Sequence, residues 1–185
     1  MKLFKRMPTQ NYLIYSILIV AGIILDQVTK LVVSTNMRLH QSIPVIENVL
    51  HITFATNDGA GFGMLDDKRW IFMSVSTVAI IAFSLYLFLG HADGKLFGLS
   101  IAMVVSGGIG NMIDRVFLGE VVDFIHTPFV KYPKFTDYGV YWSDFPIYNI
   151  ADCFVTVGAA LLIFALVRSI IKESKDAKQR KGEKK

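Results

Sequence analysis

The chain has 185 residues, of which 53% are hydrophobic, and its mean hydropathy is +0.48. This length allows one domain, and this apolar content excludes an ordinary soluble domain of the same size. The net charge of +4 is concentrated in the C-terminal tail. A basic tail directly after an apolar segment is typical of the cytoplasmic side of a membrane and of contact with anionic lipid, so no nucleic-acid partner is expected.

Four apolar segments predict membrane-spanning helices, at about 12–33, 70–89, 96–117 and 147–171. Each is long enough to cross a hydrocarbon core of about 30 Å as a helix. The first follows basic residues, as a signal peptide does. It is too long and lacks a small-residue cleavage site, so we expect it to be retained as a span.

The distribution of Lys and Arg predicts the orientation of these spans. Three such residues precede the first span, one lies in the turn between the second and third, and eight follow from Arg168 onward. The two long loops on the other side together hold five. We therefore expect residues 1–185 to form a single membrane domain with both termini in the cytoplasm and a basic tail at 172–185.

The two long loops are expected to carry structure of their own. Residues 45–54 form a β-prone, partly alternating stretch, and a glycine-rich turn follows at 57–63. Residues 124–146 are crowded with aromatic side chains. Because Tyr and Trp favour the headgroup region of a bilayer, this second loop is predicted to lie along the membrane surface.

Polar residues gather at the ends of the spans that face these loops. Their positions along the chain are Asp26, Lys30, Asn111, Asp114, Arg115, Asp123, Asn149 and Asp152. The cytoplasmic halves of the spans are almost purely apolar. An ionised carboxylate in or near hydrocarbon is costly, so acids in this position are a functional-site hypothesis.

Several of these residues also have a structural interpretation. Asp26 with Lys30, four residues apart on one helix face, and Asp114 with Arg115 are more simply explained as ion pairs that tie helices together. Asn149 is a suitable N-cap for the fourth helix.

Asp123 could be a solvated loop acid, whereas Asp152 lies in an apolar helix without a basic neighbour in sequence. If the two acids come together they could share one proton and activate a water molecule.

Other chemistries have less support. The single cysteine excludes an intramolecular disulfide and a Cys-based metal site, and the four histidines lack metal-ligand spacing, so no metal and no cofactor is expected. Cys153 and His126 could form a thiol–imidazole pair, but Cys is commonly a buried small hydrophobe. Ser106 lies among glycines that favour close helix packing.

Five segments follow one another in a fixed order: Asp-Gln-Val-Thr-Lys (26–30), Asn-Asp-Gly-Ala-Gly-Phe-Gly (57–63), Gly-Gly-Ile-Gly-Asn-Met-Ile-Asp-Arg (107–115), Val-Val-Asp-Phe-Ile (121–125) and Tyr-Asn-Ile-Ala-Asp (148–152). Together they resemble the motif set of bacterial lipoprotein signal peptidase, also called signal peptidase II. The likeness covers nearly the whole chain, including the four predicted spans.

The resemblance implies an α-helical integral membrane protein with four transmembrane helices, a small extracytoplasmic β-cradle and a membrane-surface loop or helix. It implies an aspartic endopeptidase of the bacterial inner membrane, with its active site near the extracytoplasmic face. The implied partners are diacylglyceryl prolipoproteins, cut just before the lipidated cysteine, and membrane lipids, and the protein is expected to be a monomer.

Matched to the motifs, Asp123 and Asp152 take the catalytic positions. The residues matched to supporting or substrate-contacting positions are Asn111, Asp114, Arg115, Asn149, Asn57, Gly59, Asp26 and Lys30.

Two departures from the family pattern concern the loops. The glycine-rich motif contains Ala-Gly-Phe-Gly, and the stretch between the two catalytic positions is longer than in many members. Asp137 and Asp144 in this insertion are expected to be solvated.

The alternative function is a small proton-coupled transporter, because membrane carboxylates can relay protons. Such proteins need polar residues along the whole path, which the inner halves of the spans lack. A non-catalytic scaffold would not need two acids at one depth.

Overall fold

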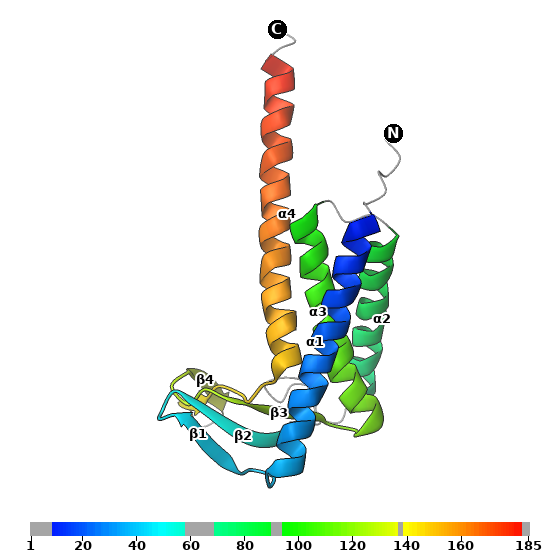
Figure 1. Ribbon diagram of the computed structural model, residues 1–185. Helices are drawn as coiled ribbons and strands as arrows, with labels where there is room; N and C mark the ends of the chain where they lie inside the picture. Colours follow the sequence, from blue (N-terminus) through cyan, green and yellow to red (C-terminus); the bar gives the residue numbers. More distant parts are fainter. Residues whose placement is uncertain (1–8, 58–68, 90–93, 137–138, 183–185) are drawn as a thin grey trace.

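The computed structural model describes residues 9–57, 69–89, 94–136 and 139–182. Its helices are α1 (Thr9–Asn36), α2 (Arg69–Phe88), α3 (Lys95–Phe117) and α4 (Ile150–Gly182). They form a bundle with the β-strands gathered at one end (Figure 1). The Thr9 end of α1 and the Gly182 end of α4 both lie at the opposite end of the bundle, as expected for an even number of crossings.

All four predicted spans are helices, and the predicted helical membrane fold with a small β-region is confirmed. By length and composition, three of the described helices can cross a membrane: Asn11–Asn36, Lys95–Phe117 and Ile150–Lys175. In the second segment the described apolar stretch, Met73–Phe88, is shorter. Large apolar side chains on the helix surfaces, such as Leu31 and Ile163, are exposed and available to lipid.

The fourth helix differs from its predicted bounds at both ends. It begins at Ile150, because Tyr148 instead forms a β-bridge with Ile125. At the other end the helix continues through the basic tail to Gly182, so that α4 projects beyond its neighbours in Figure 1. The apolar run in the sequence defined only the part of this helix that is apolar enough to cross a membrane.

A three-stranded antiparallel sheet stands at the end of the bundle, in the order β1-β2-β3. Its strands are β1 (Ser42–Ile46), β2 (Leu50–Asn57) and β3 (Val121–His126). The β-prone stretch predicted at 45–54 is thus divided into a hairpin. Asn48 occupies the turn with φ of 56°, a left-handed conformation that Asn tolerates.

Strand β3 is reached from α3 through a tight turn at Gly119. The amides of Leu118 and Gly119 both donate to the carbonyl of Asp114, which ends the helix. Gly119 has φ of 90°, a conformation that glycine adopts without steric cost. Because β3 starts only two residues later, Asp123 is fixed close to the end of α3.

The aromatic-rich segment forms strands where a surface loop or helix was predicted. It contains the hairpin β4 (Lys131–Thr136) and β5 (Gly139–Asp144), which pair with each other as a separate sheet. Aromatic and β-branched residues favour strands as well as membrane interfaces. The composition of this segment therefore did not distinguish the two structures.

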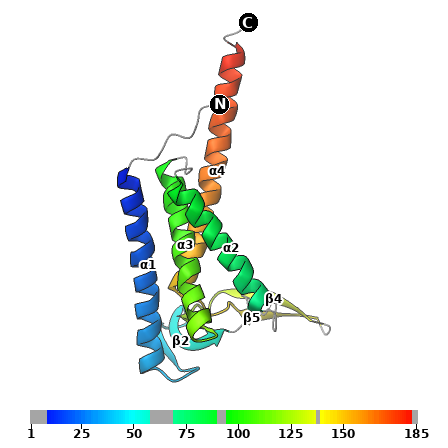
Figure 2. The ribbon, with the colours of Figure 1, turned by 90° about the vertical axis from the view of Figure 1, so that its right-hand side faces the viewer.

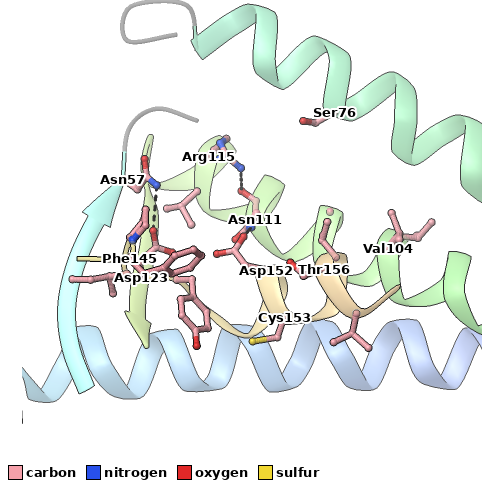
Figure 3. Close-up of a pocket in the computed structure, with 18 of the residues that line it drawn as sticks. Asn57, Ser76, Val104, Asn111, Arg115, Asp123, Phe145, Asp152, Cys153 and Thr156 are labelled. Atoms are coloured by element: carbon pink, nitrogen blue, oxygen red, sulfur yellow. Dashed lines mark hydrogen bonds between the residues drawn. The ribbon is translucent and has the colours of Figure 1, made fainter. Parts of the chain in front are cut away.

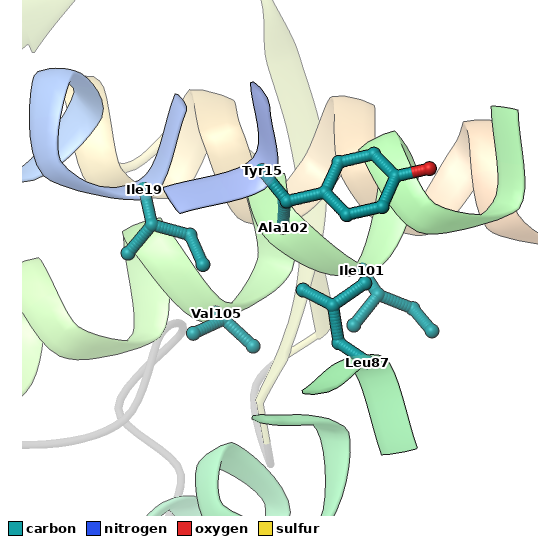
Figure 4. Packing of buried hydrophobic residues seen from close by; sticks show 6 residues of the cluster. All are labelled: Tyr15, Ile19, Leu87, Ile101, Ala102 and Val105. Atoms are coloured by element: carbon teal, nitrogen blue, oxygen red, sulfur yellow. The ribbon is translucent and has the colours of Figure 1, made fainter. Parts of the chain in front are cut away.

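The helices pack through a buried cluster of Tyr15, Ile19, Leu87, Ile101, Ala102 and Val105 (Figure 4). Glycines allow close approach around it. A Cβ at Gly107 would lie 2.2 Å from the carbonyl oxygen of Ala151, so α3 contacts α4 there directly. Ser106 donates to the carbonyl of Ile19 at 3.0 Å, which confirms its predicted role in helix packing.

Helix α2 is arranged differently from the other three. It leans away from α3 toward the end that carries the strands (Figure 2). A cavity lies between α2, α3 and α4, and Ile80 of α2, Gly108 of α3 and Val155 of α4 are among the residues that line it.

We expect Gly107→Ala to lower the stability of the protein by about 1–3 kcal/mol, since its methyl group would meet backbone atoms of α4 that cannot rotate away. Gly108→Ala is the matched control, because its nearest contacts are side-chain atoms of Ile80. Thermal unfolding of both variants in lipid nanodiscs measures the difference. Equal unfolding temperatures would show that close α3–α4 contact at Gly107 is not required.

Candidate active site

A buried lysine lies at the centre of the polar residues. Lys30 Nζ is 2.8 Å from Asp26 Oδ2 and 2.9 Å from Asp114 Oδ2, and it donates to Asn111 Oδ1 at 2.9 Å. Lys30 and the two acids are each at most 3% exposed. The predicted ion pair of Asp26 with Lys30 is present, and Asp114 forms its ion pair with this same lysine.

The two acids of this cluster also bind the backbone beside the candidate catalytic residues. Asp26 Oδ1 accepts from the amide of Ala151 at 2.9 Å, and Asp114 Oδ2 accepts from the amide of Val122 at 3.1 Å. Ala151 directly precedes Asp152, and Val122 directly precedes Asp123.

Asn149 connects Asp123 with Asp152. Its side-chain Oδ1 accepts from the amide of Asp152 at 2.9 Å, while Asp152 Oδ2 accepts from the amide of Asn149 at 3.1 Å. This is a reciprocal capping arrangement at the start of α4. The Nδ2 group of Asn149 donates to Asp123 Oδ1 at 2.7 Å. The predicted cap is therefore also a bridge to the other acid.

Each candidate catalytic acid accepts two N–H groups. Asp152 Oδ1 accepts from Asn111 Nδ2 at 2.7 Å, and its Oδ2 from the Asn149 amide. Asp123 Oδ1 accepts from Asn149 Nδ2, and its Oδ2 from Asn57 Nδ2 at 3.3 Å. The acid on β3 and the acid on α4 thus share one hydrogen-bond network.

Burial, and after it the nearby charge of Asp152, raise the pKa of Asp123 to about 7. Hydrogen bonds from Asn57 and Asn149 and the charge of Lys30 oppose this shift. Asp123 is 3% exposed, so it is not the solvated loop acid of the structural alternative. An acid with this pKa can hold a proton near neutral pH.

Both acids open into one cavity of about 780 Å³ (Figure 3). Polar groups line one part of it, among them Asn57, Asn111, Arg115 and the two acids. The rest of the wall is largely apolar and is formed by side chains such as Ile80, Phe83, Val104 and Val155. The cavity therefore places two carboxyl groups beside a volume suited to hydrocarbon.

Within the described part of the chain, the structure brings together Asp26, Lys30, Asn57, Asn111, Asp114, Arg115, Asp123, Asn149 and Asp152. Gly59 and Asp137 lie outside the described residues. Asp144 is half-exposed and pairs with Lys131, in agreement with its predicted solvent exposure.

The thiol–imidazole alternative finds no support in the contacts of His126. Its Nδ1 lies 3.3 Å from Thr53 Oγ1, and its Nε2 lies 3.8 Å from Asp144 Oδ2. Cys153 lines the cavity on α4. Burial lowers the pKa of His126, and the neighbouring His51 and Lys131 lower it further.

Gln27 is a residue of this network to which no role was predicted. Its Nε2 donates to Asp26 Oδ2 at 3.2 Å, to Asp114 Oδ1 at 2.9 Å and to the carbonyl of Gly110 at 3.1 Å. An amide inside an apolar helix, next to an acid, was the pattern that could have indicated it.

Comparison with known proteins agrees with this arrangement. The family described as signal peptidase (SPase) II matches residues 18–168. The chain belongs to the signal peptidase II family. The protein is accordingly a peptidase.

Relatives named lipoprotein signal peptidase are similar over most of their length. The protein of Anoxybacillus flavithermus is 37% identical over 173 residues, which cover 94% of this chain and 92% of the relative. The protein of Halalkalibacterium halodurans is 35% identical over 89% of this chain and 98% of the relative. The protein of Geobacter metallireducens is 37% identical over 90% and 98%.

Two solved structures, both described as bacterial membrane enzymes determined by the in meso method, share the fold of this peptidase. One superposes with a TM-score of 0.73 at 35% identity, and covers 90% of this chain and 93% of the other. The second has a TM-score of 0.69 at 36% identity, with coverage of 88% and 96%.

Asn149→Ser separates the capping role of Asn149 from its role in the site. Serine keeps an acceptor for the Asp152 amide but loses the donors to Asp123 and Asn111. We expect Asn149→Ser to be about 1 kcal/mol more stable than Asn149→Ala. Both variants should lose peptidase activity by about 100-fold or more. If Asn149→Ser cleaves normally and only Asn149→Ala fails, the residue is a helix cap and nothing more.

Proposed function

We propose that this peptidase removes the signal peptide of diacylglyceryl-modified prolipoproteins, cutting just before the lipidated cysteine with a water molecule activated by Asp123 and Asp152. One observation carries the proposal: two buried acids, from β3 and α4, are bridged by Asn149 and open into the same cavity. The relatives are named lipoprotein signal peptidase, and these names are the basis for proposing a lipoprotein substrate.

The chemistry requires one ionised and one protonated acid, because two close carboxylates cannot both ionise cheaply. The ionised acid takes a proton from water as the oxygen attacks the scissile carbonyl carbon. The protonated acid donates to the carbonyl oxygen. The raised pKa of Asp123 is consistent with such a pair near neutral pH.

The apolar wall of the cavity supports a lipid-modified substrate. Ile80 and Phe83 on α2, with Val104 on α3 and Val155 on α4, line the cavity into which the acids open. Acyl chains bound there would bury apolar surface next to the scissile bond. We propose that substrate and membrane lipids meet at this wall.

The arrangement of the helix ends supports the proposed topology. Helix α4 carries basic residues toward its C-terminal end, among them Lys172 and Lys175, and this end projects from the side of the bundle opposite the strands (Figure 1). The positive-inside rule supports a cytoplasmic location for this end, and hence our proposal that Asp123 and Asp152 lie at the extracytoplasmic side of the inner membrane. We further propose that the protein acts as a monomer, since the acids of one chain complete the dyad. The transporter alternative is not favoured, because the chain belongs to a peptidase family.

We expect Asp123→Asn and Asp152→Asn each to lower cleavage by about 100-fold or more, because each removes one proton-transfer group. The assay uses purified protein in nanodiscs and a diacylglyceryl prolipoprotein. Asp144→Asn is the control, since Asp144 is half-exposed and pairs with Lys131. Cleavage by either dyad variant at the parent rate would exclude the dyad mechanism.

The pH dependence follows from the pKa of Asp123. Because this pKa is raised to about 7, the protonated form is lost as pH rises through that value, and activity should fall there. Asn57→Ala removes a hydrogen bond that lowers this pKa, so the fall in activity on the alkaline side of the pH–rate profile should move to higher pH. Initial rates from pH ~5 to ~9 measure the shift. An alkaline limb that moves to lower pH would contradict the assignment to Asp123.

A further inference from the structure

We infer that hydrogen-bond donors fixed by Lys30 and by the N-terminus of α4 give the two acids of the dyad different roles. Asp152 is the resting carboxylate and general base, and Asp123 carries the shared proton. Lys30 is a positioning residue. This assignment rests on the dyad mechanism proposed above.

The ammonium group of Lys30 has three N–H donors and no acceptor. Its three partners are Asp26 Oδ2, Asp114 Oδ2 and Asn111 Oδ1, all within 2.9 Å. The lysine therefore has one acceptor for each donor, and the side-chain relative exposure of Lys30 is 4%.

Lys30 fixes which way the amide of Asn111 faces. Since the ammonium can only donate, the atom of Asn111 that lies 2.9 Å from it must be the oxygen. The nitrogen of Asn111 then necessarily faces Asp152 Oδ1, at 2.7 Å. Asn111 cannot turn to accept a proton from Asp152 without placing its own N–H groups against Lys30.

The second oxygen of Asp152 is held in the same way by the backbone. Its Oδ2 accepts from the amide of Asn149 at 3.1 Å, and a backbone N–H can only donate. Asp152 also lies in the first turn of α4, where the positive end of the helix dipole favours a negative charge. Both oxygens of Asp152 thus face fixed donors, an arrangement that suits a carboxylate.

Asp123 has a different environment. Asn149 Oδ1 accepts from the Asp152 amide, so its Nδ2 faces Asp123 Oδ1 at 2.7 Å. The other oxygen, Oδ2, is 3.3 Å from Asn57 Nδ2, the longest of the four bonds to the dyad. A proton on Asp123 Oδ2 therefore displaces the weakest of these bonds and can point into the cavity that Asp123 lines.

The charged groups around the pair agree with one shared proton. Asp26 and Lys30 face it from α1, Asp114 and Arg115 from α3, and each acid faces the other. Lys30 is shared between Asp26 and Asp114, so its charge cannot fully compensate two further ionised acids. Asp123, whose pKa is raised to about 7, holds the proton.

The resulting cycle balances its protons. Asp152 removes a proton from water while the water oxygen bonds to the scissile carbonyl carbon, and Asp123 gives its proton to the carbonyl oxygen, which yields a gem-diol. Asp123 then takes a hydroxyl proton back as the carbonyl reforms and the C–N bond breaks. Asp152 passes its proton to the leaving nitrogen, and both acids return to their starting states.

Infrared spectroscopy tests the assignment without relying on turnover. The full-length protein is labelled with ¹³C at the Asp carboxyl carbons, reconstituted in nanodiscs, and the protonated-carboxyl C=O band is followed against pH. In the parent a band should titrate near pH 7. Asp123→Asn should abolish it. Asp152→Asn should keep it but lower its midpoint by about 1 unit or more, because the charge of Asp152 is removed.

The assignment is overturned if the band survives in Asp123→Asn and disappears in Asp152→Asn, or if the parent has no band near pH 7. The control Asp144→Asn should leave the band unchanged. Failure of the dyad mechanism has a different signature, namely normal cleavage of prolipoprotein by either variant. A reversal of roles would leave both variants inactive and exchange only their spectra.

Lys30→Met tests the positioning role. Because the charge of Lys30 lowers the pKa of Asp123, its loss should move the Asp123 band and the alkaline limb of the rate profile to higher pH. Lys30→Arg, which keeps the charge, should move them less. Lys30→Met with Asp26→Asn avoids leaving both buried acids without a cation and serves if the single variant does not fold. A folded variant with an unchanged band would show that Lys30 is only structural.

Discussion

The structure depends on one buried ammonium group. Burying an isolated charge is costly, and Lys30 is stable in its position because it meets two carboxylates and an amide oxygen. Those two carboxylates do more than neutralise it, since Asp26 holds the amide of Ala151 and Asp114 holds the amide of Val122. Each of these backbone groups directly precedes an acid of the proposed dyad, so the ion cluster fixes the positions of β3 and α4 relative to α1 and α3.

Apolar packing alone could not achieve this placement in a membrane. Lipid tails are as apolar as leucine, so helix association there depends on close contact and on polar bonds. The glycines at 22, 98 and 107 allow the close contact, with the backbone of α4 against Gly107 as the closest approach. Directional bonds from the Lys30 cluster then set the rotation and depth of the helices. The same residues therefore support both the fold and the site.

The contacts between residues that are close in the chain could be predicted from the sequence. Asp26 and Lys30 are one helical turn apart, and Asn149 precedes an apolar helix, so each contact follows from spacing. The partner of Asp114 could not be found in this way, because Lys30 lies 84 positions away in the chain and joins it only through the packing of α1 on α3. The start of α4 and the β4–β5 hairpin were missed for a related reason. The start of α4 depends on the bridge between Tyr148 and Ile125, and the two strands of the hairpin depend on pairing with each other, which composition alone does not show.

Asn149 shows why the structural and functional interpretations of a residue need not compete. A helix cap uses only the side-chain oxygen, which here accepts from the Asp152 amide. The amide nitrogen remains to bind elsewhere, and it reaches Asp123, the carbonyl of Val122 and Asn111 Oδ1. Serine or aspartate would cap the helix as well but would offer no such donor. Asparagine is therefore the capping residue that can both start α4 and hold the acid of β3 against it, and this requirement couples the first turn of the helix to the chemistry proposed for the two acids.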